Sequence, residues 1–423
     1  MLDIVIVNGV YPPEPVVSAQ IGKDLAVCLA NMRHNVTVLC PFPSRPMGVK
    51  YPDYKNINKA MVEQQSKIKV VRLPSYVAPE SRIISRMRES CSFGWHVSRY
   101  MKRDSAVADV VYMNAWPLCG QALIAGYCAR YGIPLVIHIQ DIYPESLVNR
   151  LPDLCGRIVI PPLRALDKWI VRQAAHVVVI SANMRETYVG GRGVIPKKVS
   201  IVPNWMDEGN FVSFQSRKEV CLKYGIPDDK FTFLYLGNIA PVADVEFLIK
   251  TFHSAGQQEA QLIIAGGGSA RVACMELVSR IRAENVRFIS PVTIDDAPLI
   301  HTLAHVCLLS MREGSGLSSI PSKLPSYMFA AKPVLATVDA ESDTARFIQE
   351  AKCGWIGKAG DVEWLSAKMK ETAKIPVEVL NNMGMRGREY GLRHFSKSEG
   401  VRKLAGIVLS ASATLGHDVQ NRI

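Results

Sequence analysis

Short apolar runs alternate along the chain with segments in which apolar residues recur at helical spacing. Several runs are continuous stretches of Val, Ile and Leu, as expected of parallel strands that are buried on both faces. A helical pattern over 18–34 separates the first two runs and predicts a β-α-β unit. The expected strands of this first set cover 4–7, 36–39, 70–73, 110–112, 135–139, 177–180 and 199–202. Their alternation with helices predicts a doubly wound α/β domain.

The same alternation begins again near residue 231, which indicates a second Rossmann-like domain. Its expected strands cover 231–236, 261–265, 286–289, 306–309 and 334–336. Its expected helices cover 242–255, 270–284, 296–304 and 323–331. We therefore divide the chain into an N-terminal domain over 1–203, a C-terminal domain over 208–385 and a helical tail over 386–423. The tail is expected to pack back on the first domain.

The composition limits the class of protein. A chain of 423 residues, 48% of them hydrophobic, can bury two or three cores. No apolar run reaches the roughly 18 residues of a membrane-spanning helix, and the apolar start at 2–7 lacks the basic stretch of a signal peptide. The ten cysteines are scattered without a Cys-x-x-Cys pair. This favours a reduced cytoplasm over a zinc ribbon or a disulfide framework.

The net charge of +12 favours an anionic partner, so nucleic acid, an anionic membrane surface and phosphorylated substrates are the candidates. A nucleic-acid binder would place aromatic and basic residues on an exposed sheet, whereas the strands here are apolar. Basic and apolar residues are interleaved over 82–103, which fits an amphipathic helix at a membrane interface or a helix pair with a solvated basic face. The residues expected to face a membrane are Arg82, Arg86, Arg88 and Trp95.

Ligands of open α/β sheets bind beyond the carboxyl ends of the strands. The first strand leads into a proline-rich loop over 8–15 without a Gly-x-Gly-x-x-Gly pattern, which argues against a dinucleotide oxidoreductase. His138, near the end of another strand, is followed by Asp141 and Glu145. These side chains fit a polar ligand site and, more weakly, a metal triad. They also fit a structural loop whose carboxylates cap the next helix.

In the second domain, the segment around Lys323 is the most informative. Ser322 is expected to cap a helix, and Pro325 stands in its first turn, where a missing N–H costs little. A cation at a helix N-terminus is electrostatically misplaced unless an anion binds there. The alternative is an ordinary surface lysine beside an ordinary cap. Glycine and amide residues at the neighbouring strand ends favour a pocket for a phosphorylated, sugar-bearing ligand.

Four motifs make the chain resemble the GT-B glycosyltransferases of family 4, in the branch of bacterial capsule, colanic-acid and O-antigen biosynthesis. They cover 11–20, 138–145 (His-Ile-Gln-Asp-Ile-Tyr-Pro-Glu), 198–207 and 321–337. The resemblance implies two Rossmann-like domains facing a cleft. It also implies that the C-terminal domain holds a nucleoside-diphosphate sugar and that the N-terminal domain holds the acceptor.

Acceptors in that branch are typically saccharides on an undecaprenyl diphosphate carrier. The resemblance therefore implies a cytoplasmic protein that is peripheral on the inner membrane, with a nucleotide-sugar donor, a lipid-linked acceptor and an anionic lipid surface as partners. We expect no nucleic-acid partner, no cofactor and no metal, and we interpret the aspartates at 228–229 and 295–296 as caps or turns. Because no carboxylate pair for a covalent intermediate is evident, retention by same-face attack is the expected mechanism.

The predicted site has three groups of residues. The catalytic candidates are His138, Asp141 and Lys323. The donor-binding candidates are Gly237, Asn238, Gly266, Gly267, Ser290, Val292, Pro321, Ser322, Lys323 and Ser326. The acceptor-side candidates are Pro13, Ser18, Tyr143 and Glu145.

The chain departs from the family pattern at three positions. Asn238 and Asp244 stand where many members have an arginine and a lysine that contact the donor diphosphate. Ser326 stands where many have a glutamate that reaches the donor ribose. Lys323 is therefore expected to carry more of the diphosphate charge. The departures keep two alternatives open, a sugar-nucleotide epimerase of the same fold and a non-catalytic accessory subunit.

Overall fold

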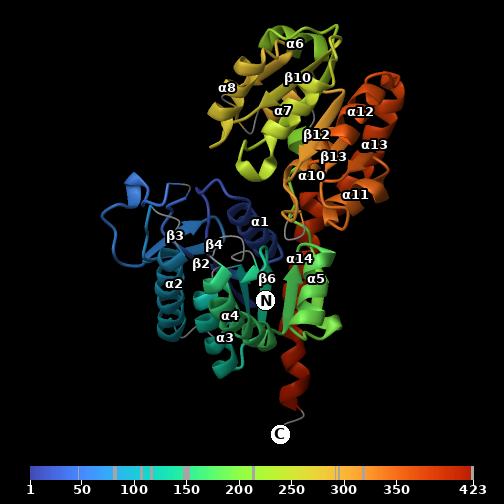
Figure 1. The fold of residues 1–423 in the computed structure, drawn as a ribbon. Coiled ribbons are helices and arrows are strands. Elements are labelled where there is room, and N and C mark those ends of the chain that lie inside the picture. Colours follow the sequence, from blue (N-terminus) through green and yellow to red (C-terminus); the bar gives the residue numbers. More distant parts are fainter. Residues whose placement is uncertain are drawn as a thin grey trace. The chain divides into compact units, whose positions relative to one another are not determined.

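The computed structural model describes residues 1–45, 47–79, 83–104, 108–114, 118–145, 153–211, 215–290, 292–293, 296–316 and 320–420. The chain forms two compact units (Figure 1). Unit 1 comprises Met1–Asn204 and Ser398–Ile423, and unit 2 comprises Trp205–Lys397. Each unit has its own mostly parallel sheet with connecting helices, so the predicted pair of doubly wound α/β domains is confirmed.

Unit 1 contains an eight-stranded sheet in the order β3-β4-β2-β1-β5-β6-β7-β8, in which only β3 and β4 pair antiparallel. The strands are β1 (Asp3–Asn8), β2 (Asn35–Pro41), β3 (Met61–Gln65), β4 (Ile68–Leu73), β5 (Val110–Asn114), β6 (Leu135–Ile139), β7 (His176–Val179) and β8 (Val199–Ile201). All expected strands are present. β3 was not expected, because its residues alternate between half-buried and exposed and form no continuous apolar run.

Three neighbouring helices of unit 1 pack in a row, α2 against α3 and α3 against α4 (Figure 1). The helices are α1 (Val17–Asn31), α2 (Ile83–Arg103), α3 (Leu118–Tyr131), α4 (Asp153–Gln173), α5 (Ala182–Glu186) and α14 (Lys397–Gln420). Gly94 and Gly120 allow α2 and α3 to approach closely, because a Cβ at Gly94 would lie 2.7 Å from the Gly120 Cα.

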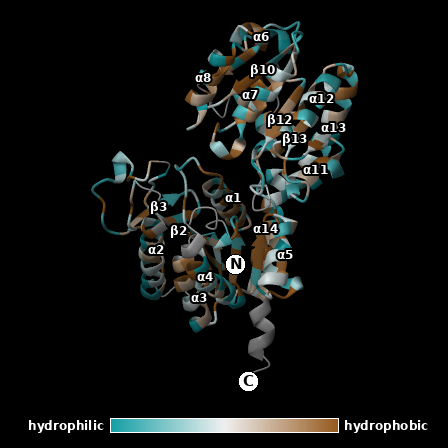
Figure 2. Cartoon of the chain, viewed as in Figure 1, coloured by the Kyte–Doolittle hydropathy of each residue, from teal (hydrophilic) through white to brown (hydrophobic). Residues whose placement is uncertain are grey.

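Unit 2 contains a six-stranded parallel sheet in the order β11-β10-β9-β12-β13-β14, and its strands are strongly hydrophobic (Figure 2). The strands are β9 (Phe231–Leu236), β10 (Ala260–Ala265), β11 (Val286–Ile289), β12 (Val306–Ser310), β13 (Val334–Thr337) and β14 (Gly354–Gly357). The edge strand β14 was not expected, because its sequence Gly-Trp-Ile-Gly holds only a short apolar pair.

Helices cover both faces of this second sheet. They are α6 (Arg217–Tyr224), α7 (Val245–Ser254), α8 (Arg271–Ile281), α9 (Ala297–Thr302), α10 (Lys323–Phe329), α11 (Asp343–Ala351), α12 (Val362–Thr372) and α13 (Val377–His394). Successive residues of a strand point to opposite faces, so Leu234 and Tyr235 of β9 belong to two different cores. α10 and α9 belong to the Leu234 side, and this side carries the candidate site.

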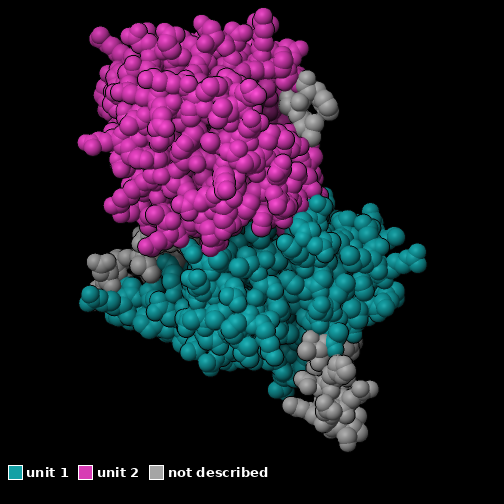
Figure 3. Space-filling view, turned by 90° about the vertical axis from the view of Figure 1, so that its right-hand side faces the viewer, with its two compact units in different colours: residues 1–204, 398–423 teal, residues 205–397 magenta. Residues whose placement is uncertain are grey.

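The C-terminal tail joins unit 1 later than the expected residue 386. α13 belongs to unit 2, where it packs against α10 and α11. Gly384 permits this packing, because a Cβ there would lie 1.9 Å from the Ala331 carbonyl oxygen. The chain returns to unit 1 at Ser398 (Figure 3). Leu404 of α14 is buried.

Candidate functional site

Tyr327 fastens α10 to the carboxyl ends of two central strands of unit 2. Its hydroxyl oxygen lies 3.1 Å from the backbone nitrogen of Leu236 in β9 and 3.2 Å from the carbonyl oxygen of Leu308 in β12. Burial raises the pKa of Tyr327, so the hydroxyl keeps its proton and can donate it to a carbonyl. The first residue of α10 is thereby held at the sheet edge where ligands of parallel sheets bind.

Lys323 extends from the start of α10 across Gly237. A Cβ at position 237 would lie 2.7 Å from the Lys323 Cε, and the φ of 144° there also favours glycine. The ammonium nitrogen lies 5.2 Å from the centre of the Tyr235 ring. Among the described residues, no carboxylate forms an ion pair with it. Burial lowers the pKa of Lys323 from 10.5 to about 8, as expected for a half-buried cation that has no ion-pair partner among the described residues.

Lys323 lines a pocket of about 260 Å³ that lies wholly within unit 2. The lining residues are Met206, Asp207, Asn210, Phe211, Leu236, Gly237, Val292, Thr293, Ala297, Pro298, His301, Ser322, Lys323 and Ser326. Five of the predicted donor-binding residues therefore meet here, namely Gly237, Val292, Ser322, Lys323 and Ser326.

The two serines of α10 behave differently from the expected cap. The prediction that Ser322 caps the helix is wrong, because its side chain makes no capping hydrogen bond. Its φ of −58° and ψ of −16° are helical, whereas a capping residue is typically extended. The Ser326 hydroxyl donates to the carbonyl oxygen of Lys323, one turn earlier in the same helix, at 2.8 Å.

The remaining donor-binding candidates do not line this pocket; they are Asn238, Gly266, Gly267, Ser290 and Pro321. The glycine-rich turn allows two loops to touch, because a Cβ at Gly266 would lie 2.2 Å from the Gly237 carbonyl oxygen. Asn238 is exposed, and its carbonyl oxygen accepts a hydrogen bond of 2.7 Å from the Tyr235 hydroxyl. Direct donor binding by these residues stays a prediction.

His301 lines the pocket, although no sequence pattern indicated it. The ring is buried, with centres 5.9 Å from Phe211 and 5.6 Å from Tyr327. Its Nδ1 lies 2.6 Å from the Ala297 carbonyl oxygen, and burial lowers the pKa of His301 to about 4, so the neutral ring carries its proton on Nδ1. Nε2 is then an acceptor, buried and without a hydrogen-bond partner among the described residues.

In unit 1, three buried polar atoms that have no hydrogen-bond partner among the described residues line one small pocket. They are His138 Nε2, Asn114 Nδ2 and Gln140 Nε2. His138 Nδ1 lies 2.8 Å from the Tyr112 hydroxyl, and burial lowers the pKa of His138 to about 3, so the imidazole is neutral near pH 7. The pocket of about 20 Å³ has room for about one water molecule.

Asp141 and Tyr143 line the same pocket, so the structure brings these two candidates together with His138. Asn114 was missed by the sequence analysis. It stands at the end of β5 in register with Asn8 of β1, so an amide at a strand end was the signal that could have found it.

Glu145 belongs to an ion-pair network instead of capping a helix of the described chain. Its carboxylate lies 2.6 Å from Arg192 and 3.0 Å from Arg164. Burial opposes its ionisation, but the Arg192 guanidinium outweighs this and lowers the pKa of Glu145. Arg192 also pairs with buried Asp167 at 2.7 Å and donates to the Tyr143 carbonyl oxygen at 3.1 Å. The network holds the loop that follows His138.

The first loop is held by the buried carboxylate of Glu14, which accepts hydrogen bonds from the backbone N–H groups of Tyr11, Ser44 and Arg45. Of the two acceptor-side candidates near it, Pro13 is exposed. The hydroxyl of the other, Ser18, donates to the Gln140 side chain at 2.5 Å and so ties the first loop to the His138 loop.

Three of the four expected membrane-facing residues lie on α2, and Arg82 lies outside the described residues. Arg86 pairs with Glu89 at 2.9 Å, Arg88 is exposed and Trp95 is 50% exposed. In the part of the chain that the structure describes, no helix is long and apolar enough to cross a membrane.

The acidic residues considered as metal ligands lie in bends or turns, or outside the described residues. Asp296 accepts hydrogen bonds from the Thr293 N–H and hydroxyl, as a turn residue does, and Asp295 is not among the described residues. Within the described ranges, no three His, Cys, Asp or Glu side chains converge as a metal-binding group. The expectation that no metal is needed stays a prediction.

Comparison with known proteins assigns both units. Residues 20–205 match the family model of the glycosyl transferase 4-like domain, and residues 230–374 match that of the glycosyl transferases group 1. A putative colanic acid biosynthesis glycosyl transferase of Escherichia coli K12, WcaI, is 22% identical over 94% of this chain and 98% of its own length. A probable glycosyltransferase of Pseudomonas aeruginosa, WbjE, is 23% identical over 66% of this chain and 68% of its own.

A solved structure shows the same fold. HepE of Anabaena, solved in complex with UDP, superposes with a TM-score of 0.71 at 13% identity over 97% of this chain and all of its own. The two family models identify the chain as a glycosyltransferase, and its two α/β units have the GT-B fold. The chain belongs to family 4 of these enzymes.

Replacing Lys323 with Met should stabilise the ligand-free protein at pH 7. The folded pKa of about 8 lies below the ordinary 10.5, so the folded state bears a cost whenever Lys323 is protonated. Stability of the wild type rises with pH between about 8 and 10.5, and the charge penalty at pH 7 is roughly 1 to 3 kcal/mol. Urea unfolding of Lys323→Met at pH 7 and pH 9.5 should show a gain that shrinks at the higher pH.

Lys370, exposed on α12, provides the matched control, and Lys370→Met should change the unfolding free energy by no more than about 0.5 kcal/mol. A Lys323→Met protein less stable than wild type at pH 7 would mean that the ammonium group has a stabilising partner in the protein.

Proposed function

We propose that this chain transfers a sugar, with retention of configuration, from a nucleoside-diphosphate sugar to a lipid-linked saccharide in surface polysaccharide biosynthesis. The observation that carries the proposal is the half-buried ammonium group of Lys323, which lines a pocket without a carboxylate partner among the described residues. A diphosphate would supply the missing negative charge. UDP is the first nucleotide to test, because HepE was solved with UDP and with UDP-glucose.

Lys323 would act mainly on the leaving group. In same-face attack, the bond between the anomeric carbon and the diphosphate oxygen breaks while the acceptor hydroxyl oxygen bonds to that carbon. The hydroxyl proton passes to the departing phosphate oxygen. Negative charge builds on the diphosphate, and a preorganised cation beside it stabilises the transition state more than the ground state. The proposal requires no metal ion and no cofactor.

Two neutral histidines would orient hydroxyl groups. His301 Nε2, an unpaired acceptor in the Lys323 pocket, is suited to accept a hydrogen bond from a donor hydroxyl. His138 Nε2 lies with Asp141 in the unit 1 pocket and is suited to bind the acceptor. Because burial lowers the pKa of His138 to about 3, protonation of this ring would not limit activity near neutral pH.

We also propose that the protein lies peripherally on the cytoplasmic face of the inner membrane. Apolar side chains are exposed on α2 and α4 beside basic ones. Trp95 is 50% exposed, Ile158 is 70% exposed and Trp169 is 41% exposed, with Arg88 and Arg157 exposed near them in the chain. Basic residues with exposed aromatic rings suit an anionic lipid surface.

A thermal-shift screen of UDP, GDP and dTDP tests the donor site. One nucleotide should raise the unfolding temperature, because it binds only the folded protein. Lys323→Ala should weaken the binding of that nucleotide at least tenfold. In transfer assays with the corresponding sugar nucleotide, it should lower turnover about a hundredfold.

Lys370→Ala, which removes an exposed lysine from the same unit, should leave both values unchanged. Normal turnover of Lys323→Ala would remove this residue from the mechanism. A wild type that responds to none of the three nucleotides would favour the accessory-subunit alternative.

Vesicle sedimentation tests the membrane proposal. The wild type should sediment with vesicles of phosphatidylglycerol and phosphatidylethanolamine, and not with phosphatidylcholine alone. The double variant Arg88→Glu/Trp95→Ala should bind at least fivefold more weakly, at about 1 kcal/mol for each lost basic residue. The control Lys23→Glu/Val27→Ala changes two exposed residues of α1 and should bind like wild type. Equal binding of the two variants would contradict a docking role for α2.

A further inference from the structure

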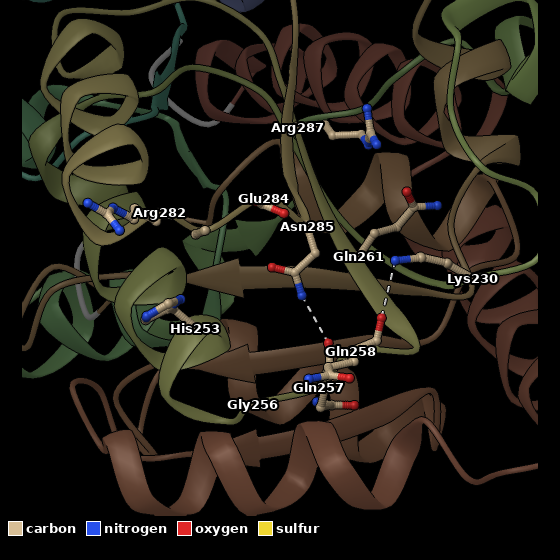
Figure 4. Close-up of a pocket in the computed structure, with 11 residues that line it drawn as sticks. Lys230, His253, Gly256, Gln257, Gln258, Gln261, Arg282, Glu284, Asn285 and Arg287 are labelled. Carbon is tan, nitrogen blue, oxygen red and sulfur yellow. Dashed lines mark hydrogen bonds between the residues drawn. The ribbon is translucent and has the colours of Figure 1, made fainter.

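A second and larger pocket opens at the opposite edge of the unit 2 sheet, at the amino ends of β9, β10 and β11 (Figure 4). Its volume is about 620 Å³, within the usual range of ligand pockets. The lining residues are Lys230, His253, Gly256, Gln257, Gln258, Gln261, Arg282, Ala283, Glu284, Asn285 and Arg287. None of the residues that carry the Lys323 pocket belongs to this set.

The charge of the lining favours an anion. Lys230, Arg282 and Arg287 face a single carboxylate, that of Glu284. No carboxylate of the described chain forms an ion pair with either arginine. In Figure 4, Arg282 stands on one side of the pocket and Lys230 on the other. Arginine recognises phosphate through two parallel hydrogen bonds, which makes phosphate the anion that suits this lining best.

Two unpaired amide atoms at the pocket point to a ligand with hydroxyl groups. Gln261 is 1% exposed, and its Nε2 donates to the Pro227 carbonyl oxygen at 2.8 Å and to the Thr232 hydroxyl at 3.0 Å. These bonds fix the amide and leave its buried Oε1 without a partner, while Gln257 has a buried Nε2 without one. A buried amide atom without a hydrogen bond is costly to the protein, and a ligand hydroxyl would satisfy each of these two atoms.

The walls of the pocket are fixed before any ligand binds. The Asn285 side chain donates to the carbonyl oxygens of Gln257 at 2.9 Å and Ala260 at 3.2 Å, so it joins the loops that precede β10 and β11. Lys230, which directly precedes β9, donates a hydrogen bond of 3.2 Å to the Gln258 carbonyl oxygen. A preformed site loses little entropy on binding.

We propose that this pocket binds a phosphorylated sugar, separately from the donor site. Arg287 and Lys230 hold the phosphate, Arg282 adds positive charge from the other side of the pocket, and Gln257 and Gln261 bind sugar hydroxyls as donor and acceptor. Apart from the imidazole of His253, the described lining has no aromatic ring, so it offers a nucleoside base no stacking platform. The ligand is therefore a sugar phosphate and not a nucleotide.

Calorimetric titration of the full chain with glucose 1-phosphate, glucose 6-phosphate, galactose 1-phosphate and mannose 6-phosphate tests this proposal. At least one should bind with a dissociation constant below about 10 mM, and glucose alone should not bind. Arg287→Glu should weaken that binding tenfold or more, since it replaces a phosphate ligand with a carboxylate. Arg280→Glu, an exposed change two residues from the pocket, and Lys323→Ala should leave it unchanged.

Four outcomes would overturn the proposal, and a folding control accompanies the test. If Lys323→Ala abolishes binding or Arg287→Glu leaves it intact, the sugar phosphate occupies another site. Inorganic phosphate binding as tightly as the sugar phosphates would reduce the pocket to a simple anion site. If none of the four compounds binds, the pocket is not a sugar phosphate site. An unchanged thermal unfolding midpoint of Arg287→Glu would show that this variant is folded.

Discussion

The candidate donor site depends on how Lys323 is held. Its side chain crosses Gly237, and its ammonium group lies near the Tyr235 ring, where burial lowers the pKa of the amine to about 8. The Tyr327 hydroxyl fixes the helix that carries it to the ends of β9 and β12. A cation placed in this way destabilises the empty protein, and an anionic ligand removes that cost. The buried cation therefore lowers the stability of the free protein and strengthens the binding of an anion, as in other preorganised electrostatic sites.

The same principle extends to the neutral polar groups. His301, His138 and Asn114 each keep one buried atom without a partner among the described residues, whereas the Glu14 and Glu145 carboxylates that hold the loops are paired. The Glu145 carboxylate, for example, forms ion pairs with Arg192 and Arg164. Residues with an unpaired buried atom are thus suited to bind ligands, whereas residues whose polar atoms are paired position the loops.

The sequence was sufficient for the fold because buried parallel strands appear as continuous apolar runs. It missed β3 and β14, which lie at sheet edges and have half-exposed or glycine-bounded sequences. Lys323 could be predicted because a cation at a helix start is unusual in itself. Asn114 was overlooked, although an amide at the end of a strand was a usable signal. His301 could not be predicted, because its role depends on which ring atom stays unpaired after folding. The failed Ser322 cap has the same origin, since a helical backbone at that residue turns its hydroxyl away from the cap.

The central claim is that Lys323 is an unpaired cation kept for a diphosphate. The most direct test is a pH titration of the Lys323 side chain by NMR on lysine-labelled protein, assigned with Lys323→Arg, with and without UDP or the nucleotide that stabilises the protein. We predict a midpoint near pH 8 in the free protein, matching the pKa of about 8, and a rise of at least about one unit with the nucleotide. A free midpoint near 10.5, or one that the nucleotide leaves unchanged, would contradict the account.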